Sequence, residues 1–297
     1  MSDYQMAPRA DFVLPFDLPE AGARGRFVRL EATAQQAIAH HDLPEVAARA
    51  EGELLALVAM LGSLLKLDGR LTVQTKSNGP LDMVVADYYG AEAGEPRGVR
   101  GMARIDQERC ANLGKNPSFA ALAGPGSLAI TIRPQAEARD YQGVVPLSPE
   151  GLGRSAEVYF GQSEQLLTMV RLAAAPMVSP GGGVSWQAGG LLLQVVPGGT
   201  HHADDWEHLI TLAGTVEDLE LVDTGLAAET LLWRLFNQED VRLLPFEPIG
   251  FRCGCARENI EAALAAYTPE ERTKLADPDG MIRARCQFCG TVHEFKV

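Results

Sequence analysis

The sequence lacks the signals of a secreted or membrane-spanning protein. Its longest apolar run, residues 54–67, contains Gly62, Ser63 and Lys66, and it falls short of the roughly 20 residues that a membrane span needs. Residues 1–12 have no basic patch followed by an apolar core, so no secretory signal is expected there. These absences predict a cytoplasmic protein in a reducing compartment, without a membrane partner.

Positive charge is scarce, and the common catalytic motifs are missing. With 26 Lys and Arg against 39 Asp and Glu, the net charge is −13, which argues against nucleic acid as the main partner. The chain has no HExxH, no His-x-Glu, no P-loop and no Gly-x-Ser-x-Gly. A G-x-G-x-x-A match at residues 151–156 follows Pro146 and Pro149, so a helix-entry turn is expected there rather than a nucleotide site. The sequence therefore predicts that the protein is not an enzyme.

Cysteine is also rare, but its placement is uneven. Of the five cysteines, Cys110 stands alone and is expected to be a buried or incidental thiol. The other four lie in the last 45 residues. In a reducing compartment, such a cluster indicates metal or redox chemistry rather than a disulfide framework. These four are Cys253, Cys255, Cys286 and Cys289.

The four clustered cysteines form a Cys-x-Cys pair and a Cys-x-x-Cys pair, separated by 30 residues. Zinc prefers four tetrahedral ligands and binds thiolates at about 2.3 Å, so the spacing predicts one Zn²⁺ held by all four sulfurs. Because no coordination position is left for water or substrate, the site is expected to be structural or regulatory rather than hydrolytic. The spacing alone supports a plain structural zinc as well as it supports a redox switch.

Two features favour a switch. Gly254 lets the backbone fold so that the two neighbouring sulfurs can approach one another. Nearby positive charge holds thiolates ionised and reactive, although the same charge could simply offset that of the site. Oxidation of both pairs would remove every ligand, together with the roughly 10–16 kcal/mol that zinc contributes to the folding of small zinc peptides. The flanking cations are Arg252, Arg257, Arg283 and Arg285.

The first two thirds of the chain mix hairpin strands with two long helices. Residues 71–75 and 81–87 predict a hairpin around the turn at 78–80. A boundary is expected at Pro197, after a tail at residues 1–10 and an α+β domain whose helices cover an antiparallel sheet. Further strands are expected at 27–30, 98–104, 128–132 and 184–196, and helices from Asp42 towards Leu67 and at 155–175.

The segment that follows is strongly acidic. Residues 201–240 hold ten acidic side chains and one basic one, a net charge of −9. Amphipathic helices are expected at 205–221 and 227–236. Like charges repel by a few tenths of a kcal/mol per i,i+4 pair, so this segment should be marginally stable unless it lies on a partner surface. Its apolar face and the sheet of the first domain are candidate dimer surfaces.

The cysteine segment itself is nearly neutral. From Phe246 onwards it carries eight acidic and seven basic residues, and helices are expected at 258–267 and 269–275. The predicted fold class is thus α+β, with a large sheet-and-helix domain, a helical acidic linker and a small zinc-binding module. Their predicted bounds are 1–197, 198–242 and 243–297.

Five further stretches stand out beside the complete CxC and CxxC motifs: LKLDGRLTVQ (65–74), GSLAITI (126–132), YFGQSEQ (159–165), AGGLLLQ (188–194) and LWRLF (232–236). With these stretches and motifs, the sequence resembles over nearly its whole length a known family, the 33 kDa heat-shock proteins, which are redox-regulated chaperones.

The resemblance implies a mechanism. The reduced, zinc-loaded protein is expected to be inactive. Oxidation is expected to join Cys253 to Cys255 and Cys286 to Cys289, to release zinc, and to unfold the module and the linker. The exposed surface then binds unfolding client proteins without ATP, protecting them from aggregation under oxidative stress, and the oxidised form is a homodimer. Cys110 lies outside this pattern.

The main alternative is a zinc-ribbon binding module with a purely structural zinc and a nucleic-acid or protein partner. Binding to nucleic acid predicts a basic tail. The near-neutral cysteine segment, with the acidic segment beside it, does not meet that expectation.

Overall fold

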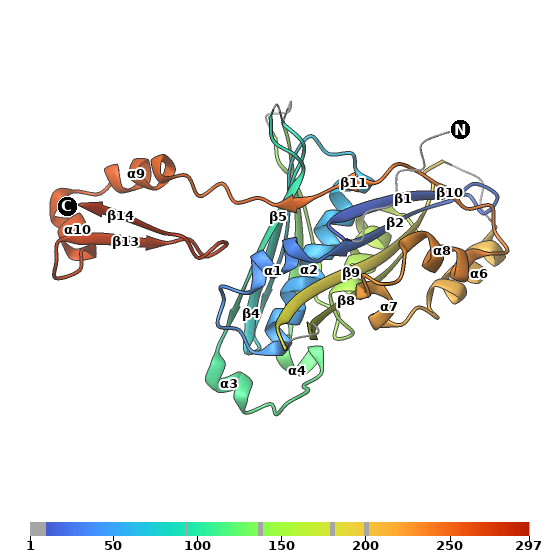
Figure 1. The fold of residues 1–297 in the computed structure, drawn as a ribbon, viewed down its shortest axis with the longest axis horizontal. Helices are drawn as coiled ribbons and strands as arrows, with labels where there is room; N and C mark the ends of the chain where they lie inside the picture. The colour runs from blue at the N-terminus through green and yellow to red at the C-terminus, as the bar shows by residue number, and fades with distance from the viewer. Residues whose placement is uncertain (1–9, 93, 136–138, 179–181, 199–201, 297) are drawn as a thin grey trace.

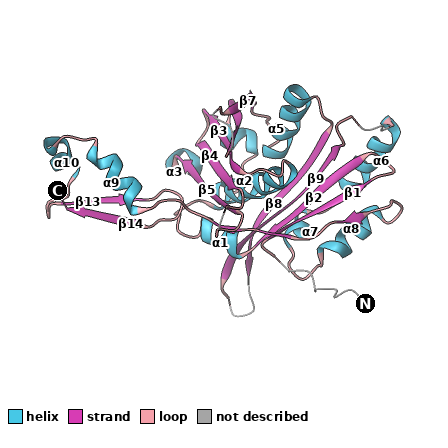
Figure 2. Cartoon of the chain, turned by 90° about the horizontal axis from the view of Figure 1, so that it is seen from above, coloured by secondary structure: helices cyan, strands magenta, loops and turns pink. Residues whose placement is uncertain are grey.

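The computed structural model describes residues 10–92, 94–135, 139–178, 182–198 and 202–296. Its larger part consists of two antiparallel sheets with a long helix between them (Figures 1 and 2). The expected tail at residues 1–10 lies, except for Ala10, outside the described residues.

The first sheet has the strand order β1-β2-β9-β8 and the second β5-β4-β3-β6-β7, and neighbouring strands in both are antiparallel. The expected hairpin is confirmed as β3 and β4. Strands β1 and β7 were not expected. The strands of the first sheet are β1 (Phe12–Leu18), β2 (Ala23–Leu30), β8 (Thr168–Val178) and β9 (Val184–Val195). Those of the second are β3 (Gly69–Ser77), β4 (Leu81–Tyr89), β5 (Gly98–Ile105), β6 (Gly126–Pro134) and β7 (Tyr141–Pro146).

Helix α2 (Glu45–Leu64) begins after Pro44 as expected and buries sixteen of its twenty residues. A helix that is apolar on nearly every side belongs in a core rather than on a surface, and α2 lies between the two sheets. Gly62 lets the helix approach the ring of Tyr88 on β4, which a Cβ atom at that position would meet. Other helices of this domain are α1 (Ala32–Ile38), α3 (Gln107–Ala111), α4 (Phe119–Ala123) and α5 (Leu152–Tyr159).

The expected helix at 155–175 is wrong in its second half. Helix α5 passes into a single π-helical turn, η1 (Phe160–Glu164), and Gln165 then takes a left-handed conformation with φ 55°. Strand β8 follows, and its apolar Val170 and Ala174 lie at a spacing that a helix would also produce. An apolar stretch this short fits both the 3.6-residue period of a helix and the two-residue period of a strand. Its pairing with β9 makes it a strand.

The acidic segment packs on the outer face of the first sheet. It forms α6 (Ala203–Ala213), α7 (Asp218–Val222) and α8 (Ala228–Phe236), so the single helix expected at 205–221 is in fact two. A capping box between Glu217 and Glu220 starts α7 as a separate helix. The buried side chains of the three helices join those of the sheet in a second core. Its members include Phe12, Phe16, Phe27, Leu191, Leu209, Leu221, Leu232 and Phe236.

This packing corrects the expectation that the apolar face of 205–236 is exposed and free to form a dimer. Its main apolar side chains are covered by the sheet, although Trp233 on α8 remains 67% exposed. The fully buried Arg29 of β2 fastens the segment by donating hydrogen bonds to the carbonyl oxygens of Glu220, Leu221 and Leu226 at 3.1, 3.2 and 2.6 Å. Burial lowers the pKa of Arg29 to about 10.

An extended segment, residues 242–252, then crosses the edges of both sheets; we call it the strap. Strands β10 (Arg242–Leu243) and β11 (Glu247–Pro248) pair with the outer edge of β1. Strand β12 (Gly250–Phe251) pairs in parallel with the outer edge of β5. The strap thus ties the two sheets together directly before the first cysteine of the cluster.

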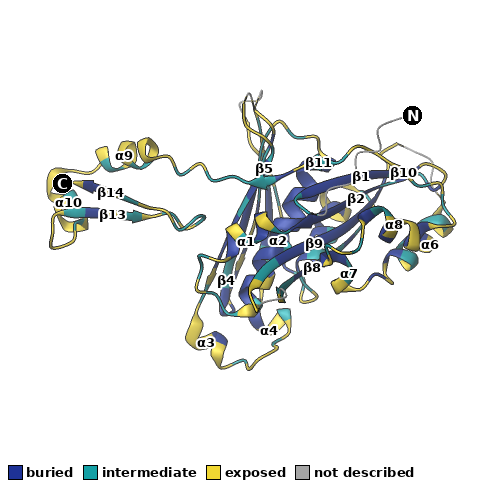
Figure 3. Ribbon diagram, in the orientation of Figure 1, coloured by how far each residue is buried: buried dark blue, intermediate teal, exposed yellow. Residues whose placement is uncertain are grey.

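The last described residues form a module that projects from this body (Figures 1 and 2). Neither of its helices buries a residue, as Figure 3 also shows. Within residues 253–296, all of them described, Ile282 and Phe295 are the only buried hydrophobic side chains, and they are partners across the hairpin. No described helix is long and apolar enough to cross a membrane. The module's elements are α9 (Arg257–Ala265), α10 (Pro269–Leu275), β13 (Met281–Arg285) and β14 (Val292–Lys296).

Candidate metal centre

The four clustered cysteines converge where the module meets the body of the protein. Their Sγ atoms all lie within 4.8 Å of one another. The nearest pairs join the two motifs: Cys253 to Cys286 at 3.6 Å and Cys255 to Cys289 at 3.3 Å. All four are free thiols and half-buried. The structure thus brings together every residue that the sequence predicted as a ligand.

Two pieces of local structure place these sulfurs. The strap delivers Cys253 and Cys255 directly after β12 and before α9. The other pair lies in the tight loop of the β13–β14 hairpin, closed by hydrogen bonds from the Cys286 amide to the Thr291 carbonyl and from the Gly290 amide to the Cys286 carbonyl. Gly290 has φ 69°, and a Cβ atom there would lie 2.9 Å from the His40 ring. A glycine is therefore needed both for the turn and for the close approach.

The donor set fits a soft divalent cation. Four thiolates at about 2.3 Å from a tetrahedral ion would have sulfur–sulfur separations of roughly 3.7–3.8 Å, close to the observed arrangement. Four sulfur ligands are typical of zinc. The ion, when bound, would hold the four sulfurs together and keep them as thiolates.

The thiols of the cluster differ in acidity. Burial raises the pKa of both Cys253 and Cys255. Burial also acts on Cys289, but its hydrogen bonds with Thr291 and with the other thiols outweigh this and lower the pKa to about 7. Because metal ligands must be deprotonated, ion binding would displace the protons from all four.

The hairpin loop that carries CxxC also contacts the first domain. His41, between α1 and α2, lies with its Nε2 2.6 Å from the Gln287 carbonyl oxygen and its Nδ1 3.2 Å from the buried Glu51 carboxylate. Burial lowers the pKa of His41, but the hydrogen bond and charge of Glu51 outweigh this and raise it above its ordinary value. Arg285 donates a hydrogen bond to the His40 carbonyl at 3.1 Å.

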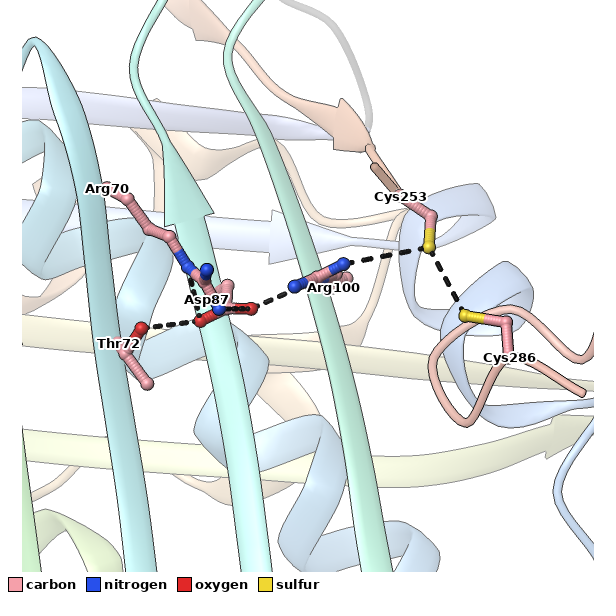
Figure 4. Close-up of polar contacts among 6 residues, drawn as sticks. All are labelled: Arg70, Thr72, Asp87, Arg100, Cys253 and Cys286. Atoms are coloured by element: carbon pink, nitrogen blue, oxygen red, sulfur yellow. Dashed lines mark hydrogen bonds and ion pairs between the residues drawn. The ribbon is translucent and has the colours of Figure 1, made fainter. Parts of the chain in front are cut away.

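A second contact comes from the second sheet and reaches a cysteine directly (Figure 4). Arg100 of β5 donates from Nη1 to the Sγ of Cys253 at 3.8 Å. Its Nε donates to the Asp87 carboxylate at 2.8 Å. Its guanidinium carbon also lies 3.9 Å from the centroid of the Phe288 ring, inside CxxC. One side chain of the first domain thus contacts both halves of the cysteine motif.

Comparison with known proteins agrees with this architecture. The family model described as Hsp33 protein matches residues 11–296. The chain belongs to the Hsp33 family. The 33 kDa chaperonin of Caulobacter vibrioides (strain NA1000 / CB15N) is 38% identical over 290 residues, covering 96% of this chain and 94% of the relative. That of Vibrio cholerae is 38% identical over 276 residues, covering 93% and 89%.

A solved structure also matches the fold. The crystal structure of the 33 kDa chaperonin from Thermotoga maritima superposes with a TM-score of 0.76 at 20% identity, covering 96% of this chain and 95% of that chain. The names of the curated relatives identify them as chaperonins. The resemblance drawn from the sequence is confirmed.

Several residues near the Hsp33 motif behave differently from the sequence-based expectation. The flanking arginines were expected either to hold the thiolates ionised or simply to offset the charge of the site. In the structure three of them have other partners: Arg252 pairs with Glu92 and Glu95, Arg257 lies over the Phe295 ring, and Arg283 pairs with Asp277, Asp279 and Glu294.

The cation that reaches a cysteine is Arg100, more than 150 residues away in the sequence. The contact of His41 with the hairpin loop was likewise not expected from the sequence. No local signal marks either position, because both contacts depend on how the module folds back. Cys110 is buried on α3, apart from the cluster, and its pKa is raised by burial.

Proposed function

We propose that this Hsp33-family chain is a redox-regulated, ATP-independent holdase that is inactive while its four cysteines hold one Zn²⁺. The observation that carries the proposal is the convergence of four thiols at the base of a module with almost no apolar core of its own. Such a module depends on its metal to fold. Loss of the four thiolate ligands would therefore unfold the module.

The proposed activating step is oxidation of Cys253 with Cys255 and of Cys286 with Cys289. In forming each disulfide, a pair of thiolates gives up two electrons to an oxidant such as hydrogen peroxide, which takes up two protons from the solvent and is reduced to two water molecules. No thiolate then remains to bind the ion. We divide the chain functionally at 1–197, 198–242 and 243–297, as the domain, linker and switch module.

The proposed consequence is release of the linker. The strap connects the cysteines to the acidic helices, and the face beneath those helices carries large apolar side chains suited to unfolded clients. The −9 charge of residues 201–240 adds self-repulsion that favours detachment. If amides in place of five of its carboxylates left the activation threshold unchanged, this electrostatic contribution would be refuted.

The proposal also includes the setting: a cytoplasmic, non-catalytic protein that is a homodimer when oxidised and has neither nucleic acid nor membrane as partner. The acidic composition supports the exclusion of nucleic acid. Unfolding proteins are the proposed clients, as the chaperonin names of the relatives suggest.

The deciding experiment is client light scattering. A chemically unfolded protein is diluted into buffer with the chain, either reduced and zinc-loaded or treated with peroxide at raised temperature. We expect only the oxidised chain to suppress aggregation, and we expect Cys110→Ser to behave as the wild type. If both forms suppressed aggregation equally, or if neither did, the metal would have a purely structural role and the proposed switch would be wrong.

A further inference from the structure

The first domain holds a buried carboxylate, Asp87, and one of its partners, Arg100, reaches the cysteine cluster. Asp87 lies near the C-terminal end of β4, with its side chain fully buried. Its neighbours in register are Thr72 on β3 and Arg100 on β5. Thr72 donates a hydrogen bond to it at 2.6 Å, Arg70 donates two at 2.8 and 3.1 Å, and Arg100 donates one at 2.8 Å. Each carboxylate oxygen is thus satisfied, which a buried charge requires.

This arrangement fixes the direction of Arg100. Its Nε is held by Asp87, so the other end of the planar guanidinium faces outward, beyond the edge of β5. There it donates to Cys253 and lies over the ring of Phe288. Side-chain exposure is only 11%, so these contacts are little screened by water. A flexible cation would not be held in this position without the carboxylate behind it.

We propose that Arg100, oriented by Asp87, is the positioning residue that fastens the cysteine cluster to the first domain and that loses its hold when the cluster is oxidised. This inference rests on the proposed function for its redox part. Four thiolates and one divalent cation carry a charge of −2, whereas two disulfides carry none. Oxidation therefore removes the negative charge that attracts the guanidinium and replaces the thiolate acceptor of its hydrogen bond with a neutral disulfide sulfur, which is a weaker acceptor.

Arg100 lies directly beside the residues of β5 that pair with the strap. Phe251 pairs with Val99, directly before Arg100, and the Arg252 amide donates to the Val99 carbonyl at 3.0 Å. Strand β12 contributes only two register pairs, too few to hold by themselves. The last part of the strap is held by the pairing of Arg252 with Glu92 and Glu95 and by the contacts of Arg100, and loss of the latter should loosen β12.

A second buried carboxylate, Glu51, likewise holds a side chain that contacts the CxxC half of the cysteine motif. Glu51 of α2 is fully buried and holds His41, which in turn contacts the carbonyl of Gln287. Arg100 differs in contacting both halves, through Cys253 and Phe288. It is therefore the single contact whose removal should loosen the whole cluster.

Hydrogen exchange of the reduced, zinc-loaded full chain tests the proposal without oxidant. We expect the amides of Gly250 and Arg252 to exchange roughly tenfold faster in Arg100→Gln, which corresponds to about 1.4 kcal/mol of lost protection. Phe288→Leu, which leaves Asp87 and all four cysteines in place, should accelerate the same amides by a smaller factor. The matched control is Arg104→Gln: Arg104 lies four residues further along β5 and pairs with Asp82 of β4, away from the cysteines.

The outcomes separate cleanly. Faster exchange in Arg100→Gln and Phe288→Leu but not in Arg104→Gln supports the proposal. So does earlier zinc release under peroxide in the first two variants alone. Exchange at the wild-type rate in Phe288→Leu and Arg100→Gln overturns it, as does equal acceleration in Arg104→Gln. Because exchange is read on the reduced chain, failure here is distinct from failure of the proposed chaperone switch, which light scattering reads.

Discussion

In the first domain, α2 places sixteen buried residues between two sheets, whereas in the cysteine module neither α9 nor α10 buries any. The first domain therefore draws its stability from apolar burial, at roughly 25 cal/mol per Å². The module has Ile282 and Phe295 and a set of surface ion pairs, and such pairs contribute little. The contrast teaches that one chain can join a part with a large apolar core to a part with almost none, and under the proposed function the second part depends on its four sulfurs to fold.

The largest expected effect comes from removing the metal ligands. Cys255→Ser with Cys289→Ser should abolish tight zinc binding, and the module should lose most of the roughly 10–16 kcal/mol that such sites provide. The measurement is limited proteolysis with mass spectrometry: new cuts within 253–296, with the first domain intact. Cys110→Ser is the control. A double variant whose module still resists the protease would contradict the metal dependence.

The next effect concerns the face that links the two regions. Phe236 on α8 is fully buried near Phe16, so Phe236→Ala should cost about 3–5 kcal/mol. We expect cleavage within 202–241 in the reduced protein, with zinc still bound. Trp233→Ala on the same helix is the control, because that side chain is largely exposed. Equal sensitivity of the two variants would show that α8 is not held by its apolar face.

A cavity in the first core should affect that domain alone. Leu57→Ala in α2, at a fully buried position, should lower the free energy of unfolding by about 2–5 kcal/mol. Urea denaturation followed by circular dichroism measures this, and zinc content per chain should stay at one. If the variant folded but no longer bound zinc, the two regions would be more interdependent than the comparison implies.

The smallest expected effect is pH-dependent. Burial raises the pKa of Glu53 on α2 to about 7, although Arg49 partly opposes this. The folded state therefore binds this proton more tightly than the unfolded chain, so stability falls as pH rises from about 4.5 through 7. Glu53→Gln should stabilise the domain by about 1–2 kcal/mol at pH 8 and hardly at all at pH 4. Urea midpoints at both pH values test this, with Glu45→Gln as an exposed control on the same helix.

Much of the site could be predicted from the sequence because the relevant signals are local. The four cysteines, their spacing, the β3–β4 hairpin and the helix after Pro44 all depend on residues close together in the chain. Strand β8 was assigned to a helix because its short apolar stretch fits both periods, and only its pairing with β9 decides between them. The contacts of Arg100 and His41 were beyond prediction for a related reason. Each joins segments far apart in the sequence, and no pattern along the chain specifies them.

The strap has a further consequence for how the sheets end. It covers the outer edge of β1 and the outer edge of β5 with pairings of two residues each. Uncovered edges present a row of unsatisfied amide and carbonyl groups, to which any extended chain can add as a new strand. The strap thus covers one edge strand of each sheet. Its departure would convert two closed edges into templates that recognise backbone rather than sequence.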